Sequence, residues 1–214
     1  MTPLAAEAVE GVTNQLVTTD TGAMGVSWLL LVLPLLGFVA CLVLRRNLKE
    51  RVALLAIGAS VLTFLLSVAI FLQVRDEQAT HLVLGFTWLD IGSFTVHFDF
   101  VIDQLTSVML LVVTGVGSLV HVYSWGYMYG DERFERFFAY LNLFLFSMLV
   151  LVLGSSFLTL FVGWELVGLS SYLLIGFWFE KAAYAAAAKK AFITNRVGDV
   201  AFMIAMFMIF REFG

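Results

Sequence analysis

Three charged residues lie inside two strongly apolar stretches of the sequence. Glu165 interrupts residues 137–179, and Arg196 and Asp199 interrupt residues 191–210. An ionisable side chain inside a membrane costs about 2.5 to 3.5 kcal/mol or more, and such a residue usually has a function. A carboxyl group there can change between a charged and a protonated form, which a proton relay requires. We interpret Glu165 as a proton-relay group; the alternative is an ion pair that only holds helices together.

The surroundings of these charges favour close contact between helices. Gly163 and Gly168 flank Glu165, and small residues let another helix, or water, approach a side chain closely. Arg196 and Asp199 are three residues apart, so they share one face of a helix and partly neutralise each other. For these two residues a functional role and a self-contained structural pair stay equally open.

The remaining residues that could do chemistry are histidines and one cysteine. His121 lies near the inner end of an apolar run, where an interfacial polar group is the favoured interpretation and a proton relay is the alternative. We expect His81 and His97 to be solvated. Cys41 is the single cysteine of the sequence, so we expect no disulfide framework and no metal site. The sequence has no haem-ligating or iron–sulfur pattern, so we expect no cofactor and no electron transfer within this chain.

The composition indicates an all-α transmembrane fold. Hydrophobic side chains make up 61% of the 214 residues and charged ones only 13%, which is too little polar surface to cover a water-soluble protein. We therefore expect a lipid bilayer around the chain, and the net charge of −4 does not indicate a nucleic-acid partner. Several uncharged runs exceed the roughly 20 residues that span a bilayer as a helix. We predict about six transmembrane helices, at about 26–44, 52–74, 101–124, 134–153, 157–178 and 191–211.

The distribution of cations predicts the orientation. Most of the twelve Lys and Arg fall in three short connections: Arg45, Arg46, Lys49 and Arg51; Arg133 and Arg136; Lys181, Lys189 and Lys190. In an up-and-down topology these connections share one side, which the positive-inside rule makes cytoplasmic. Residues 1–25 carry acidic residues and no Lys or Arg. We expect an acidic outer segment there, followed by a retained first helix and not by a cleaved signal peptide.

The sequence divides into two helical parts, residues 26–75 with the first two helices and residues 101–214 with the other four. Residues 76–100, which connect these parts, have a different pattern of polar and apolar residues. Phe94, Val96, Phe98 and Phe100 alternate with polar residues, a period of two that is typical of a half-buried strand. The preceding apolar run 81–89 and the break at 90–93 predict a β-hairpin on the outer surface. Asp103 is expected to cap the third helix.

Four ordered motifs carry a resemblance to a known family. They are His121-Val122-Tyr123-Ser124; residues 136–144; Gly163-Trp164-Glu165-Leu166-Val167-Gly168 followed by residues 171–176; and residues 190–192 followed by Asn195-Arg196-Val197-Gly198-Asp199. Together they closely resemble the antiporter-like subunit of respiratory complex I (NADH:quinone oxidoreductase) that is called subunit L in bacteria and chain 5 in mitochondria. That subunit is related to the large subunit of Mrp-type sodium/proton antiporters. The resemblance covers most of residues 80–214.

The resemblance implies a proton-translocating half-channel that begins in residues 101–214, with Glu165 essential and Arg196 and Asp199 as polar residues of the sixth helix. It also implies other membrane subunits of complex I as partners and an inner (plasma or organellar) membrane as the location. A sodium/proton antiporter subunit and a purely structural scaffold are the alternatives. Family members continue with a broken helix whose lysine pairs with the glutamate. No intramembrane lysine occurs here, so we expect a portion of a longer subunit, or a split or truncated product.

Overall fold

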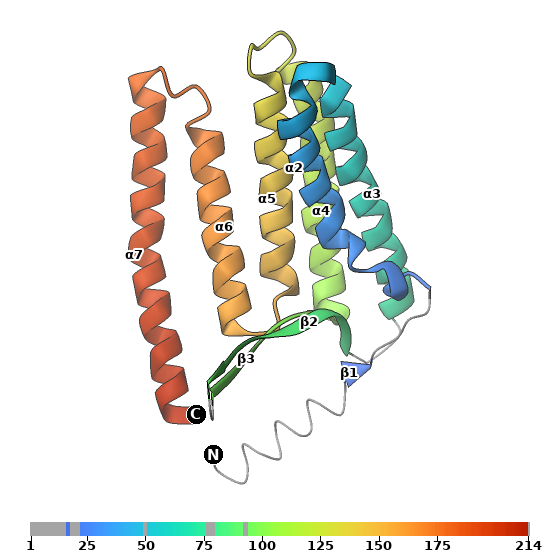
Figure 1. Ribbon diagram of the computed structural model, residues 1–214, viewed down its shortest axis with the longest axis vertical. Helices are drawn as coiled ribbons and strands as arrows, with labels where there is room; N and C mark the ends of the chain where they lie inside the picture. Colours follow the sequence, from blue (N-terminus) through green and yellow to red (C-terminus); the bar gives the residue numbers. More distant parts are fainter. Residues whose placement is uncertain (1–15, 18–21, 49–50, 76–79, 92–93, 214) are drawn as a thin grey trace.

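The structure, a computed structural model, describes residues 16–17, 22–48, 51–75, 80–91 and 94–213. Within these residues the chain forms six helices that are long and apolar enough to cross a membrane, so it is a multi-pass membrane protein. They are α2 (Leu29–Leu48), α3 (Arg51–Val74), α4 (Gln104–Tyr127), α5 (Phe134–Leu153), α6 (Phe157–Ile175) and α7 (Ala182–Phe213), and a short 3-10 helix, η1 (Met24–Val26), precedes α2. Figure 1 shows the six long helices standing side by side in an up-and-down order.

The prediction of six helices is confirmed, and the differences lie at the helix ends. Helix α4 begins only at Gln104, because the preceding strand continues to Ile102. Asp103 caps α4 as predicted, since its carboxylate accepts a hydrogen bond of 2.7 Å from the backbone N–H of Thr106. Helix α7 begins at Ala182 and not near residue 191, because the alanine-rich stretch before residue 189 is itself a strong helix former.

The predicted β-hairpin between the second and third long helices is also confirmed. Strands β2 (Thr80–Ile91) and β3 (Phe94–Ile102) pair antiparallel, from His81 opposite Ile102 to Ile91 opposite Phe94. A third strand, β1 (Leu16–Val17), pairs parallel with β2 and was not predicted. Most of the expected acidic segment 1–25, and residues 92–93 of the expected break, lie outside the described residues.

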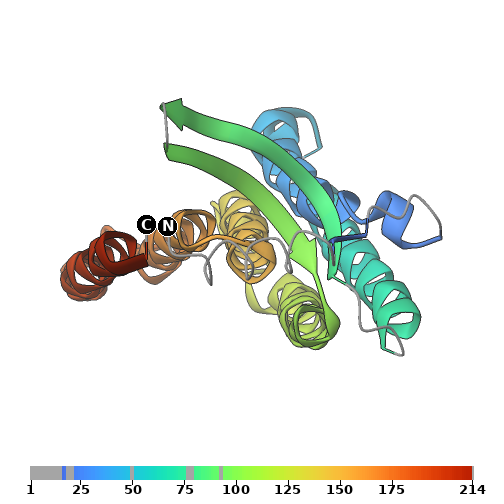
Figure 2. The same ribbon diagram turned by 90° about the horizontal axis from the view of Figure 1, so that it is seen from below.

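One face of the hairpin packs against the helices. Figure 2 shows β2 and β3 curving across one end of the bundle. Val96, Phe100 and Ile102 are buried, and the backbone N–H and hydroxyl of Ser155 both donate to the carbonyl of Asp99 at 3.1 Å. The hairpin is thereby fixed to the turn between α5 and α6.

The two histidines of the hairpin differ from each other. His97 is exposed, as expected. The expectation of a solvated His81 is wrong, because only 2% of this residue is exposed. His81 lies opposite Ile102, and residues opposite each other in adjacent strands point to the same face of the sheet. That face is the one turned toward the helices, so His81 is buried together with Ile102.

Several small hydroxyl residues are buried on α3 and α4, two helices that pack against each other. Ser60, Thr63, Ser107, Thr114 and Ser118 are all buried. Thr63 and Thr114 donate to backbone carbonyls of their own helices, while Ser118 donates across the contact to the carbonyl of Ser60 at 2.9 Å. Because these side chains are small and satisfied, the two helices can approach closely without leaving unpaired polar groups in an apolar surrounding.

The two ends of the bundle differ in charge. The connections after α4 and α6 lie at one end, where α2 also ends, and the hairpin lies at the other end (Figure 1). This arrangement agrees with the up-and-down topology that the cations predicted. Lys189 and Lys190, however, belong to the first turns of α7 and not to the connection before it.

We predict that the hairpin faces the outside and the connection between α4 and α5 faces the cytoplasm, because the cation-rich end should stay inside. Cys41 is replaced by serine, and the exposed positions are tested singly as His97→Cys and Tyr129→Cys with an impermeant thiol reagent on intact cells. We expect the cysteine at position 97 to react, and the one at position 129 to react only after permeabilisation. The reverse labelling pattern would contradict this orientation.

Candidate functional site

The three charged residues singled out in the sequence come together between α6 and α7. A guanidinium nitrogen of Arg196 forms an ion pair with the carboxylate of Glu165. Glu165 lies near the middle of the 19-residue helix α6, and Arg196 lies near the middle of the 32-residue helix α7. Both helices are long enough to cross a membrane, so this ion pair lies far from the ends of two membrane-spanning helices.

Asp199 is the third member of the site and its most deeply buried one. Its side chain is only 4% exposed, and its Oδ2 lies 3.2 Å from Nε of Arg196. Its other oxygen accepts a hydrogen bond of 2.7 Å from the indole N–H of Trp164. Arg196 therefore lies between two carboxylates, one from each helix, and Trp164 fixes the orientation of the buried one.

The glycines near Glu165 have the role that the sequence suggested. A Cβ atom at Gly163 would come within 2.5 Å of the backbone nitrogen of Leu151 on α5, so only glycine allows α6 to lie this close to α5. A Cβ at Gly168 would lie 3.3 Å from Nη2 of Arg196. The guanidinium also lies over the ring of Phe192, 4.5 Å from its centroid, a favourable cation–π arrangement. The arginine is thus confined on several sides.

The charges of the site do not cancel. Two carboxylates share one guanidinium, so Glu165, Arg196 and Asp199 together carry a formal charge of −1 when all three are ionised. Arg196 Nε and Asp199 Oδ2, although close, make no hydrogen bond with any described residue. In an apolar surrounding an uncompensated charge is costly. One more positive charge, either a proton or a cationic side chain, would therefore neutralise the site and lower its energy.

The Glu165–Arg196 ion pair can be reached from outside the described part of the chain. The side chain of Glu165 is 27% exposed and that of Arg196 is 33% exposed, whereas Asp199 is nearly inaccessible. Of the two carboxylates, that of Glu165 is therefore the more accessible one.

His121 belongs to a different part of the bundle. It is 1% exposed, so the favoured interpretation of an interfacial polar group is wrong: the helix α4 face that carries His121 packs against α5. Its Nδ1 lies 2.7 Å from the carbonyl of Gly117 and its Nε2 lies 3.1 Å from the amide nitrogen of Asn142. Within the described residues, no hydrogen bond or ion pair links it to Glu165, Arg196 or Asp199. The alternative, a relay, stays a prediction.

Two polar partners were not found from the sequence. Trp164 and Asn142 are single residues in apolar helices, and each contacts its partner on another helix. The only signal in the sequence is that Trp164 adjoins Glu165, and adjacency does not place two side chains on one helix face. Such partners become visible only when the rotation of one helix against the next is known.

The fold and the site together define a multi-pass membrane protein with an ionisable group enclosed between two of its helices. Residues 88–138 match the family described as "NADH-Ubiquinone oxidoreductase (complex I), chain 5 N-terminus". Residues 154–214, which contain the whole site, match the family described as "NADH:quinone oxidoreductase/Mrp antiporter, TM".

Individual proteins with similar sequences are subunits of the same enzyme complex that the matching families describe. The chain is 46% identical over 192 residues to NADH-quinone oxidoreductase subunit L of Mycobacterium tuberculosis. The aligned region covers 88% of this chain and 30% of the relative. It is 44% identical to subunit L of Escherichia coli, with 87% and 31% covered, and 41% identical to NADH-ubiquinone oxidoreductase chain 5 of Metridium senile, with 87% and 31% covered. The chain belongs to the subunit L/chain 5 family of complex I and corresponds to an N-terminal portion, about 30% of the length of these relatives.

A solved structure shares the fold. A chain of the membrane-bound sulfane sulfur reductase, described as an archaeal respiratory membrane complex, superimposes with a TM-score of 0.72 at 20% sequence identity. The match covers 84% of this chain and 36% of that chain. At this level of identity the likeness concerns the arrangement of the helices alone.

We predict that Arg196→Ala destabilises the protein strongly, because it leaves Glu165 and Asp199 without their shared cation; breaking a buried pair in this way costs about 3 to 5 kcal/mol. Trp164→Phe serves as a control, since it removes one hydrogen bond and should cost about 1 to 3 kcal/mol. The readouts are the amount of full-length protein in the membrane and its thermal unfolding in detergent. Equal stability of the Arg196 variant and the wild type would contradict the shared pairing.

Proposed function

We propose that this chain is part of a proton-translocating membrane subunit of NADH:quinone oxidoreductase, in which quinone reduction by other subunits drives proton movement through the membrane. The observation that carries the proposal is the position of Arg196 between Glu165 and Asp199 in the middle of two membrane-spanning helices. The names of the relatives and the matching families support the same conclusion.

In the proposed mechanism Glu165 alternates between a paired and an unpaired state. When Arg196 pairs with Glu165, the protonated carboxyl group releases its proton, and the resulting carboxylate stays charged for as long as the pair lasts. When Arg196 turns toward Asp199, Glu165 loses its counter-charge and takes up a proton from a water chain. The contact of 3.2 Å between Arg196 and Asp199 means that this change requires only a small reorientation of the guanidinium.

The magnitudes are compatible with one proton for each cycle. Making or breaking an ion pair at about 4 Å changes the energy by about 4 kcal/mol when the effective dielectric constant is near 20. Moving one proton against about 150 mV requires about 3.5 kcal/mol, at the usual 2.3 kcal/mol per 100 mV. A single rearrangement of the Glu165–Arg196 pair is therefore large enough to drive one proton across.

The proposal also covers partners and location. We expect the chain to assemble with other membrane subunits of complex I in the inner (plasma) membrane of a bacterium, or in an inner membrane of an organelle. We further propose that it holds no redox cofactor and that electron transfer takes place in other subunits. The lysine that the family resemblance implies would come from a later helix, and the exposed side of Glu165 is open to such a partner.

A sodium/proton antiporter subunit is the second candidate, because the family that matches residues 154–214 includes the Mrp antiporters. Both candidates would use the same carboxylate. They differ in the transported ion: proton pumping that is driven by quinone reduction should not depend on sodium. Transport by the full-length complex in proteoliposomes that requires sodium would favour the antiporter.

We predict that Glu165→Gln in the full-length subunit abolishes most proton pumping while the complex still assembles. Glutamine keeps the shape and the hydrogen-bonding capacity of the side chain but cannot exchange a proton. Glu165→Asp should be milder, because the carboxylate remains and only its reach is shorter. Proton flux and quinone reduction are measured in proteoliposomes, and quinone reduction should fall in parallel if the two are tightly coupled.

Glu180→Gln is the matched control for this experiment. Glu180 also pairs with an arginine, Arg133, but it lies in the connection before α7 and its side chain is 51% exposed. This variant should pump normally. Normal pumping by Glu165→Gln would exclude the relay role and would favour a structural scaffold. Proton conduction by residues 1–214 alone would exclude the need for a partner from elsewhere in the complex.

Asp199→Asn should reduce pumping more than assembly. The asparagine can still accept the hydrogen bond from Trp164, so the contact between α6 and α7 is retained, but the counter-charge that attracts Arg196 away from Glu165 is lost. Pumping rate and the amount of assembled complex are measured in the same membranes. An equal decrease of both would assign Asp199 a structural role only.

A further inference from the structure

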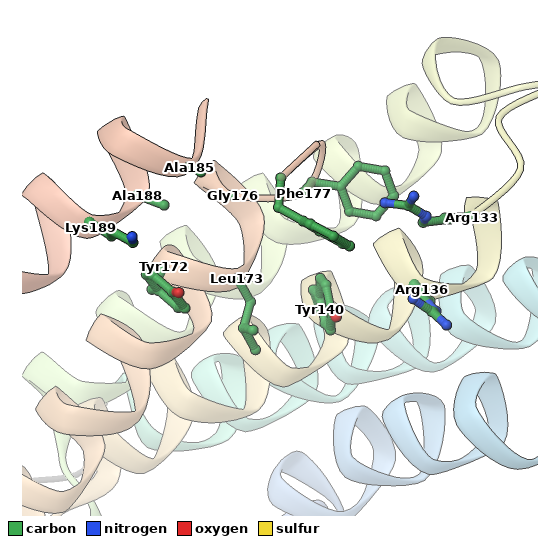
Figure 3. A pocket seen from close by; sticks show the side chains of 11 residues that line it. Arg133, Arg136, Tyr140, Tyr172, Leu173, Gly176, Phe177, Ala185, Ala188 and Lys189 are labelled. Carbon is green, nitrogen blue, oxygen red and sulfur yellow. The ribbon is translucent and has the colours of Figure 1, made fainter. Parts of the chain in front are cut away.

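A cavity of about 190 Å³ lies at the cation-rich end of the bundle, where α5, α6 and α7 meet. It lies apart from Glu165, Arg196 and Asp199, none of which lines it. Figure 3 shows Lys189 and Tyr172 on one side of the ring of Phe177, and Arg133 and Arg136 on the other. One water molecule occupies about 30 Å³ of liquid volume, so the cavity has room for a group as large as a phosphate.

The lining of the cavity is positively charged. Among the described residues that form it, Arg133, Arg136 and Lys189 are cationic and none is acidic. Arg133 is neutralised in part by its ion pair with Glu180. Arg136 and Lys189 form no ion pair with any other described residue. Arg136 on α5 and Lys189 on α7 both line this one cavity, and cationic side chains without an acidic partner attract an anion.

The cavity also offers a hydrogen-bond donor that has no acceptor among the described residues. Nη1 of Arg133 is buried and makes no hydrogen bond with the described part of the chain. Tyr140 and Tyr172 also line the cavity, and each ring is held by an aromatic neighbour, Phe177 and Phe192 respectively. Guanidinium and hydroxyl groups are the usual donors to phosphate oxygens.

We propose that this cavity binds the phosphate head group of an anionic phospholipid. Basic pockets between transmembrane helices at the cytoplasmic side are suited to anionic lipid head groups. The position along the helices fits: Arg136 lies in the first turn of α5 and Tyr172 in the last turn of α6. The cavity therefore lies at the level where a membrane-spanning helix passes from hydrocarbon to head groups.

The surface next to the cavity favours a lipid over a soluble phosphate. Ile193 and Val197 follow Lys189 at intervals of four residues on α7, so the three lie on one face of the helix. Ile193 is 62% exposed and Val197 is 71% exposed. This apolar stripe runs from the cation toward the middle of the helix, where an acyl chain attached to the bound head group would lie against it. A soluble phosphate has no acyl chain that could pack against this apolar surface.

The proposal is tested with the full-length complex in phosphatidylcholine nanodiscs that contain a trace of photoactivatable phosphatidylglycerol. Cross-linked peptides are mapped and quantified by mass spectrometry. Each basic side chain near an anionic lipid contributes roughly fivefold in affinity. The double variant Arg136→Gln/Lys189→Gln should therefore lower saturable labelling of the α5–α7 peptides by roughly thirtyfold. Both side chains are exposed, so the substitutions should leave the fold intact, which the amount of assembled complex verifies.

Lys190→Gln is the matched control, since Lys190 adjoins Lys189 on α7 but does not line the cavity; it should label like the wild type. Three outcomes would overturn the proposal. The first is unchanged labelling of the double variant. The second is equal labelling by a photoactivatable phosphatidylcholine, which would remove the requirement for an anionic head group. The third is displacement of the label by inorganic phosphate but not by chloride at equal ionic strength, which would assign the site to a soluble phosphate.

Discussion

A charged side chain is costly in the hydrocarbon of a membrane unless it has a partner, and this constraint determines how α6 and α7 meet. Arg196 satisfies it by pairing with Glu165 on α6 and Asp199 on its own helix. Few side chains of α7 are otherwise buried. The ion pair and the hydrogen bond from Trp164 to Asp199 therefore fix the rotation of α7 against α6. Gly168 makes room for the guanidinium at this contact.

This interaction also explains why a site that holds helices together can be functional. A fully compensated pair would be stable in one arrangement. Here, however, one guanidinium contacts two carboxylates at the same time, the ion-paired one of Glu165 and that of Asp199 at 3.2 Å, so one negative charge is left without a counter-charge among the described residues. The hydroxyl-lined contacts elsewhere in the bundle, such as Ser118 with Ser60, have all their polar groups satisfied and leave no such charge. The unequal charge count distinguishes the site from the packing around it.

The sequence predicted the features that depend on composition and periodicity. Long apolar runs, three of them without any charge, predicted the six helices; the alternation from Phe94 to Phe100 predicted the hairpin, and Asp103 predicted the start of α4. The predictions failed where the structure of one chain segment depends on its contact with another segment. Strand β1 is only two residues long and exists through its pairing with β2. His81 is buried because of the strand opposite it. The start of α7 was placed too late because the cations Lys189 and Lys190 were interpreted as a connection, although the alanines before them extend the helix.

The surroundings of His121 show what a relay role for this residue would require. Since the carbonyl of Gly117 can only accept a hydrogen bond, Nδ1 of His121 carries the hydrogen, and Nε2 then accepts from the amide of Asn142. A second proton on Nε2 would face the donating side of that amide, so the amide would have to turn over. Its oxygen has no hydrogen-bond partner among the described residues and lies against Gly37, where a side chain would collide with it. The turn would bring this oxygen to Nε2 but would break the hydrogen bond from Asn142 to the carbonyl of Phe138. A relay role for His121 would therefore require a rearrangement at the contact between α4 and α5, whereas the relay proposed for Glu165 requires only the movement of one arginine side chain.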